Sequence, residues 1–140
     1  MSKAQEPGAA APVLRSTIKV YLEDTDALGV VYHANYLKFF ERARTDYLDE
    51  YGVGLKGAQD LGFRFVVHSV SVQFHRPAVL GDRLDIETVI QKPSEYRLSF
   101  TQKAFRGGED RPLATGKVDV VCIDARGEVC EITDQLLRLI

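Results

Sequence analysis

The chain has 140 residues, which is about the size of one domain and enough to bury one continuous core. Hydrophobic residues make up 45% and charged residues 27%, an ordinary globular composition that argues against disorder and against a membrane span. The formal net charge of −2, without any run of Lys or Arg, argues against a nucleic-acid partner.

Residues 1–13 contain small residues, Gly and Pro but no apolar core of signal-peptide length. No segment approaches the roughly 18 consecutive apolar residues of a membrane-spanning helix. We therefore expect a flexible tail over 1–13, a single domain over 14–140, and a cytoplasmic location.

A short strand is predicted over 15–22, where apolar and polar residues alternate. From Ala34 the apolar residues follow a helical period of 3.6, which predicts one amphipathic helix ending near Gly52. Its apolar arc contains Tyr36, Phe39, Phe40, Ala43, Tyr47 and Tyr51. A loop containing Gly57 and Gly62 is expected next.

The period then falls to two, which predicts a long strand over 65–76 that ends at Pro77. Strict alternation places five residues on its apolar face: Val66, His68, Val70, Val72 and Phe74. His68 is therefore expected to be a core histidine, whereas His75 falls on the opposite face as a surface or interface residue.

Four further strands are predicted over 84–90, 96–102, 113–123 and 128–131, followed by a brief helix over 134–139. Short connections favour antiparallel neighbours, and a single long helix with an apolar face must cover one face of the sheet. The fold class is thus α+β, with a sheet wrapped around one central helix. Cys122 and Cys130 are expected to be reduced packing thiols.

The chain lacks the sequence motifs of several enzyme classes. The chain has no Gly-x-Ser-x-Gly elbow, no Gly-rich phosphate loop with a Lys, and no paired histidine spacing for zinc. We therefore expect no metal and no cofactor.

The stretch "EDTDALGVVYHANY" is the remaining candidate for chemistry. Asp26 precedes the predicted helix by a turn containing Gly29, and the helix start offers unpaired amides and a dipole that attracts negative charge. From the residues alone, these acids fit either a catalytic carboxylate or a helix cap in a solvated acidic loop.

The longer stretch "EDTDALGVVYHANYLKFFERAR" resembles the signature of hotdog-fold acyl-CoA thioesterases of the 4-hydroxybenzoyl-CoA thioesterase family, particularly the Tol-Pal-associated branch. The similarity persists through "VVHSVSVQFHRPAVLGDRLDI" and covers roughly residues 15 to 131. It implies the hotdog fold, an antiparallel sheet wrapped around one long central helix. It also implies hydrolysis of a short-chain or aromatic acyl-CoA to free acid and CoA.

The resemblance also implies roles for individual residues. Asp26 is implied as the catalytic carboxylate, acting as general base or as nucleophile. His33 is implied to provide its backbone amide to the oxyanion, and its side chain to orient water or the carbonyl. Asn35 and Tyr36 are implied as structural.

Substrate contacts are expected around the thioester and at the rim of the site. Those near the thioester come from Gly29, Val30, Val31 and Tyr32, and Arg76 is expected to contact the CoA phosphates. Lys103 and Arg106 are further candidates at the rim. Leu28 stands where the family often has a small residue, which would narrow the acyl pocket.

Two other functions stay open: a noncatalytic acyl-CoA or acyl-carrier binding module, and a hotdog dehydratase, although the His-Phe-Pro-Gly motif of one such branch is absent. Glu41 is a secondary catalytic candidate, because another hotdog branch uses a helix Glu. Arg44 is expected to be structural, paired with Glu41 or with an acid of another subunit. The family implies a homodimer or homotetramer, paired through an exposed strand edge, with the acyl channel between subunits.

Overall fold

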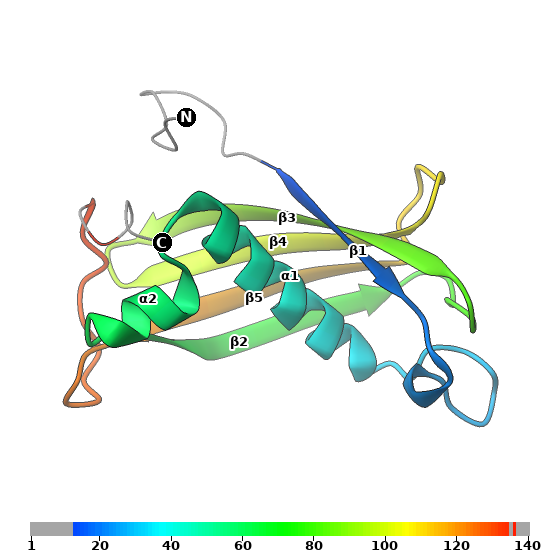
Figure 1. The fold of residues 1–140 in the computed structure, drawn as a ribbon, viewed down its shortest axis with the longest axis horizontal. Coiled ribbons are helices and arrows are strands. Elements are labelled where there is room, and N and C mark those ends of the chain that lie inside the picture. The colour runs from blue at the N-terminus through cyan, green and yellow to red at the C-terminus, as the bar shows by residue number, and fades with distance from the viewer. Residues whose placement is uncertain (1–12, 135, 137–140) are drawn as a thin grey trace.

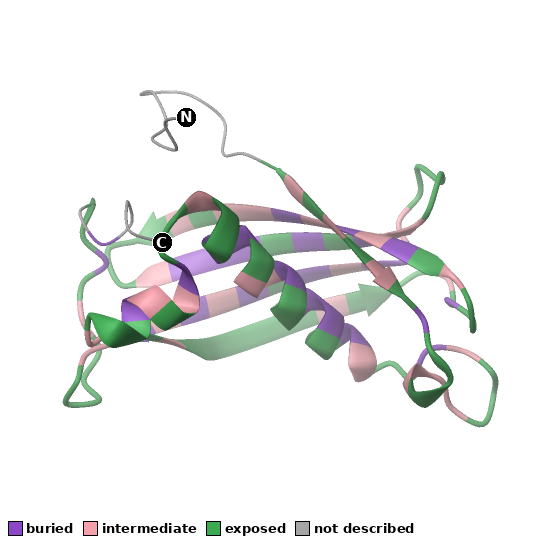
Figure 2. Cartoon of the chain, viewed as in Figure 1, coloured by how far each residue is buried: buried purple, intermediate pink, exposed green. Residues whose placement is uncertain are grey.

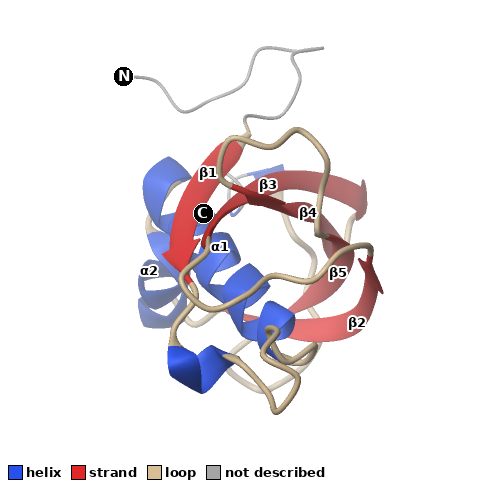
Figure 3. Ribbon diagram, turned by 90° about the vertical axis from the view of Figure 1, so that its right-hand side faces the viewer, coloured by secondary structure: helices blue, strands red, loops and turns tan. Residues whose placement is uncertain are grey.

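A computed structural model describes residues 13–134 and 136 of the chain. Five antiparallel strands form one sheet in the order β1-β3-β4-β5-β2, and the sheet curls around helix α1 (Figures 1 and 3). The strands are β1 (Leu14–Lys19), β2 (Arg64–Phe74), β3 (Arg83–Ser94), β4 (Arg97–Arg106) and β5 (Ala114–Ile123). The predicted α+β class, a sheet wrapped around one long helix, is confirmed.

Helix α1 (Asn35–Tyr51) buries its apolar face against the concave side of the sheet, as the purple stripe in Figure 2 shows. Its buried residues are Tyr36, Phe39, Phe40, Ala43, Tyr47 and Leu48. Each fully buried large side chain contributes about 1.5–3 kcal/mol. Gly116 of β5 permits the close approach, because a Cβ there would lie 2.7 Å from a ring carbon of Phe40.

A buried polar network links the middle of α1 to the sheet. The Gln102 amide is fully buried, and its Nε2 donates to the carbonyl of Phe40 at 2.8 Å and to Oγ1 of Thr88 at 3.0 Å. Its Oε1 accepts from Nη1 of Arg44 at 3.1 Å. Burial lowers the pKa of Arg44, and the charge of Glu41 opposes that shift. Arg44 is thus structural as expected, but its hydrogen-bond partner is Gln102 rather than Glu41.

A second helix, α2 (Gly54–Asp60), occupies the region predicted to be a loop, and that prediction was wrong. Gly54 adopts a φ of +76°, which reverses the chain after α1, and Ala58 is buried in the core beneath. With only seven residues, two of them glycines, α2 is too short to give a periodic signal.

Strand β2 contains a bulge that strict alternation did not predict. Val67 pairs with Val120 and Ser69 with Asp119, so His68 is an extra residue in the strand. His68 is therefore exposed, and its prediction as a core histidine was wrong. His75 is exposed as expected, with its ring nitrogen 3.0 Å from Oγ1 of Thr115.

The bulge also changes which valines share a face. Val67 lies on the same face as Val70, because their partners Val120 and Val118 both point towards α1. Val66 was predicted on that face, but its partner is Val121 and it lies on the outer face. A bulge shifts the alternation by one residue, so a pattern of apolar residues alone cannot locate it.

The ends of the chain differ from prediction in detail. β1 ends at Lys19, and residues Leu22–Asp24 form a 3₁₀ turn, η1. The strand predicted over 128–131 is instead a single β-bridge between Ile123 and Val129. Most of the helix predicted over 134–139 and most of the tail predicted over 1–13 lie outside the described residues.

The two cysteines are free thiols in the core region near the end of β5. Their sulfur atoms lie 3.3 Å apart, and burial raises the pKa of Cys122 to about 12. Both are thus packing thiols, as the sequence predicted. Among the described residues, no helix is long and apolar enough to span a membrane.

Candidate functional site

Asp26 lies in a tight hairpin between β1 and α1. Its N–H donates to the carbonyl of Val30 at 3.0 Å, and its carbonyl accepts from the N–H of Gly29 at 3.0 Å. Gly29 has a φ of +80°, which a residue with a side chain rarely adopts. The Asp26 side chain is half-buried, and its Oδ1 accepts from the N–H of Leu28 at 2.9 Å. One carboxylate oxygen is thus fixed by the turn, and the other has no partner among the described residues.

Asp24 connects this hairpin to the start of α1. Its carbonyl accepts from the N–H of Tyr32 at 2.9 Å and from Nδ2 of Asn35 at 2.8 Å. Its carboxylate accepts from the N–H of Tyr21 at 2.9 Å. Asp24 and Asn35 therefore have structural roles, which separates them from Asp26.

The start of α1 offers hydrogen-bond donors beside the hairpin. The amides of Asn35, Tyr36 and Leu37 donate to the carbonyls of residues 32, 33 and 34. The backbone N–H groups of His33 and Ala34 have no acceptor within the described part of the chain. Such donors at the positive end of a helix dipole can stabilise an oxyanion.

The side chains around these donors are mostly open to solvent. His33 is exposed, and its ring centroid lies 4.6 Å from that of Tyr32 and 6.1 Å from that of Phe74 at the end of β2. Tyr32 is exposed as well, whereas Val31 is 5% exposed and packs in the core. Val30 forms a bridge with Val79, so this part of the site is held by the loop after β2.

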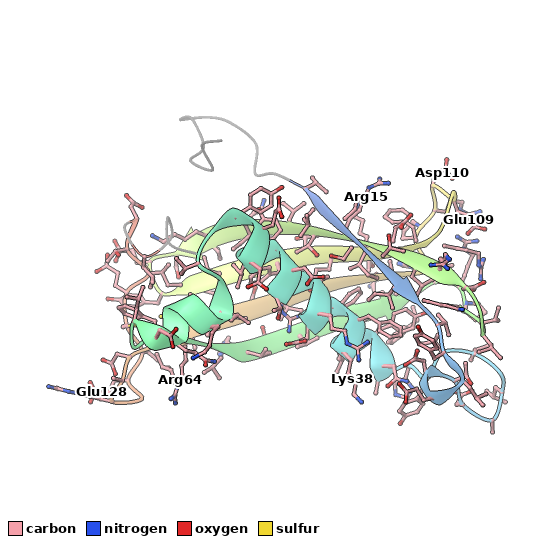
Figure 4. All side chains as sticks on the ribbon, viewed as in Figure 1. Arg15, Lys38, Arg64, Glu109, Asp110 and Glu128 are labelled. Atoms are coloured by element: carbon pink, nitrogen blue, oxygen red, sulfur yellow. The ribbon has the colours of Figure 1, made fainter. Side chains whose placement is uncertain are left out.

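Arg76 lies just past β2 and is held in an ion pair. Its Nη2 lies 3.0 Å from Oε1 of Glu109 and 2.6 Å from the carbonyl of Arg111. Arg76 and Arg106 together lower the pKa of Glu109. Figure 4 shows Glu109 at the same end of the molecule as the loop that carries Asp26. Arg76 thus lies at this end, but an acid of its own chain neutralises it.

A cleft of about 540 Å³ lies between α1 and β2, lined by Leu37, Lys38, Glu41, Arg42, Arg44, Val67, Val70 and Val118. Glu41 is exposed at this cleft, and its Oε1 accepts from the hydroxyl of Thr45 at 3.2 Å. Asp26 does not line it. Leu28 does not line it either and is 84% exposed at the tip of its hairpin, so it does not narrow this cleft.

The hairpin is supported from behind by residues 78–82, whose role was not predicted from the sequence. The carbonyl of Ala78 accepts from the N–H of Val31 at 2.8 Å, and Oδ2 of Asp82 accepts from the N–H of Val79 at 2.9 Å. The signals in the sequence were the Arg-Pro-Ala triplet of residues 76–78 and the Gly-Asp pair of residues 81–82, which matched the family without indicating a contact.

Comparisons with known proteins agree with this fold. The family profile described as the thioesterase-like superfamily matches residues 20–140. The chain is 40% identical over 112 residues to the acyl-CoA thioester hydrolase YbgC of Escherichia coli. The aligned region covers 80% of this chain and 83% of that protein.

Two solved structures are also similar. A probable thioesterase from Bartonella henselae superposes with a TM-score of 0.80 at 32% identity, covering 87% of this chain and 100% of that one. A 1,4-dihydroxy-2-naphthoyl-CoA thioesterase from Synechocystis superposes with a TM-score of 0.82 at 25% identity, covering 91% and 93%.

Proposed function

The chain belongs to the thioesterase-like superfamily, and we infer that it is an acyl-CoA thioester hydrolase with the hotdog fold. The activity predicted from the resemblance is confirmed at this level. Within that activity, we propose that Asp26 and the start of α1 form the catalytic site. The observation that carries this proposal is the half-buried Asp26 carboxylate in a hairpin that leads directly to the unpaired amides of His33 and Ala34.

The proposed chemistry requires few groups. The Asp26 carboxylate either takes a proton from a water that attacks the thioester carbonyl, or attacks that carbonyl itself to give a mixed anhydride. The His33 amide stabilises the oxyanion that develops, and the His33 side chain orients the water or the carbonyl. A thiol has a pKa of about 8.5, so the thiolate leaves with little acid assistance.

The proposed substrate is a short-chain or aromatic acyl-CoA. Gly29, Val30, Val31 and Tyr32 surround the thioester in this proposal, and Arg76 contacts the CoA phosphates at the rim. The Synechocystis neighbour is named for an aromatic acyl-CoA, which supports an aromatic acyl group as one candidate. Arg76 would have to leave its ion pair with Glu109 to bind a phosphate. The exchange is favoured where the phosphate carries more negative charge than the carboxylate.

We propose that the protein is a homodimer or homotetramer that pairs along β2. This strand is an edge of the sheet, and it exposes Val66, Val67, Val70 and Phe74 by 43–50%. The cleft between α1 and β2 opens beside that edge, so a second copy would cover apolar surface and close the cleft. We propose a cytoplasmic location as well, and the Tol-Pal association rests on the family resemblance alone.

The test is thiol release from short-chain, long-chain and aromatic acyl-CoAs by the wild type and by Asp26→Asn. We expect release by the wild type and a loss of at least about 100-fold in kcat/KM in the folded variant. Acyl-CoA bound without turnover would instead support a binding module, and hydration of an enoyl-CoA without thiol release would support a dehydratase. An undiminished rate in the variant would refute the role of Asp26.

A further inference from the structure

Arg106 lies at the end of β4, and its guanidinium holds the loop that connects β2 to β3. Its Nη2 donates to the carbonyl of Pro77 at 2.8 Å, and its Nε donates to Oδ2 of Asp82 at 3.1 Å. A third nitrogen, Nη1, lies 3.4 Å from both carboxylate oxygens of Glu109. A planar guanidinium can make these contacts together, whereas an ammonium group cannot reproduce their directions.

The loop from Pro77 to Asp82 is closed on itself and fixed to the core. The same Oδ2 atom of Asp82 accepts from the N–H of Val79 at 2.9 Å. The carbonyl of Asp82 accepts from the N–H of Val20 at 2.8 Å, and the N–H of Gly81 donates to the carbonyl of Val20 at 3.1 Å. Arg106 thus hydrogen-bonds to both the first residue of this loop, Pro77, and the last, Asp82.

The middle of this loop holds the hairpin that carries Asp26. The carbonyl of Ala78 accepts from the N–H of Val31 at 2.8 Å, and Val79 bridges Val30. The carbonyl of Val30 in turn accepts from the N–H of Asp26 at 3.0 Å. Three hydrogen bonds, joined by the peptide links from Pro77 to Ala78 and from Val30 to Val31, therefore connect the Arg106 guanidinium to the backbone of Asp26.

Resting on the proposed function, we propose that Arg106 is a positioning residue that holds the loop over residues 77–82 against the hairpin and so fixes the Asp26 carboxylate beside the start of α1. It touches neither the substrate nor the reacting atoms in this role. The role differs from the contact with CoA phosphates that the sequence suggested, because Asp82, Glu109 and a carbonyl already occupy the donors of Arg106.

The experiment compares Arg106→Lys with the wild type on an acyl-CoA and on the matching acyl-pantetheine, which lacks the nucleotide and its phosphates. Arg97→Lys is the matched control, since Arg97 lies on the same strand and its Nη1 is 4.0 Å from Asp119. A displaced carboxylate slows the chemical step more than it weakens binding. We expect kcat to fall about 10-fold with KM changed less than about 3-fold, equally on both substrates, and no change for Arg97→Lys.

Asp82→Asn provides a second, independent variant that keeps the size of the side chain. It weakens the acceptor shared by Arg106 and Val79, so we expect a fall in kcat of the same kind. In the double variant Arg106→Lys/Asp82→Asn the two losses should not multiply, because both residues act through one loop. If Arg106→Lys fails to fold, the single variant Asp82→Asn decides the question, because an unchanged kcat in folded Asp82→Asn would overturn the proposal.

Three results would overturn the proposal. A higher KM on the acyl-CoA alone would make Arg106 a phosphate contact. A lower melting temperature with unchanged kcat per folded molecule would make it merely structural. Losses in kcat that multiply in the double variant would show that Arg106 and Asp82 do not act through the same loop. Failure of the proposed function itself looks different, because Asp26→Asn would then hydrolyse thioesters as fast as the wild type.

Discussion

The hairpin around Asp26 and the middle of helix α1 each present a carboxylate, and their surroundings differ. Asp26 is held by backbone hydrogen bonds beside amides that lack acceptors within the described residues. Glu41 is exposed at the cleft between α1 and β2, where its carboxylate accepts a hydrogen bond from the hydroxyl of Thr45. The presence of a cleft alone would favour Glu41, whereas preorganised donors for a developing oxyanion favour Asp26.

The polar groups near these carboxylates differ in the same way. Beneath α1, Gln102 has partners for both its oxygen and its nitrogen, which makes that network a structural element. At the start of α1, the donors are left for a ligand. Satisfied buried groups stabilise the fold, whereas accessible unsatisfied groups are available to bind substrate. Single substitutions in the two regions should therefore affect either stability or catalysis.

The largest effect is expected for Asp26→Asn. The amide oxygen of Asn can still accept from the N–H of Leu28, so the hairpin should keep its turn while the charge is lost. We expect kcat/KM to fall at least about 100-fold with stability nearly unchanged, measured by thiol release and by urea unfolding. Asp110→Asn, in the exposed turn after β4, is the control and should retain full activity. Equal losses in both variants would contradict a specific role for Asp26.

Gln102→Leu should show the opposite behaviour. It leaves Thr88, Arg44 and the carbonyl of Phe40 without their partner, which costs about 2–3 kcal/mol in the free energy of unfolding. The activity per folded molecule should change little. Gln91→Leu, an exposed position on β3, should change the unfolding free energy by less than about 0.5 kcal/mol. A large loss of kcat in stable Gln102→Leu protein would connect the network to the chemistry.

Gly29→Ala separates hairpin geometry from overall stability. Both Gly29 and Gly127 have a φ near +80°, and neither has a neighbouring atom within 4 Å of an added Cβ. Each alanine should therefore cost about 1 kcal/mol in unfolding free energy through backbone strain alone. Only Gly29→Ala should also lower kcat, by about 10-fold, because it shifts Asp26. Equal kcat values for the two variants would show that the hairpin conformation has no catalytic importance.

The smallest effect is expected for Glu41→Gln. Among the described residues, its carboxylate hydrogen-bonds only to Thr45 and acts electrostatically on Arg44, so kcat/KM should change by less than about 3-fold. Initial rates of thiol release over a range of substrate concentrations provide the measurement. A loss comparable to that of Asp26→Asn would transfer the catalytic role to the cleft between α1 and β2.

The sequence predicted those parts of the fold that depend on local periodicity. The start of α1, its apolar face and the positions of most strands along the chain follow from spacing, whereas the pairing of β2 with β5 does not. The bulge at His68 and helix α2 escaped prediction, because one extra residue or a seven-residue helix changes too little of the pattern.

The candidate site likewise contains residues that the sequence could predict and residues that it could not. Asp26, Gly29 and His33 lie close together in the sequence, where the family signature could identify them. Arg106 lies 29 residues from Pro77 and 24 from Asp82, and the family match gave no sign that it holds their loop. Contacts of this kind depend on the packing of whole strands, which a single sequence does not encode in any local pattern.

A crystal structure of Asp26→Asn with an unreacted acyl-CoA would test the central claim most directly. We expect the thioester carbonyl oxygen about 2.7–3.1 Å from the His33 amide, and the carbonyl carbon about 3–3.5 Å from the side chain of residue 26 or from a water bound to it. A thioester bound beside Glu41 in the cleft between α1 and β2, away from residue 26, would contradict the account.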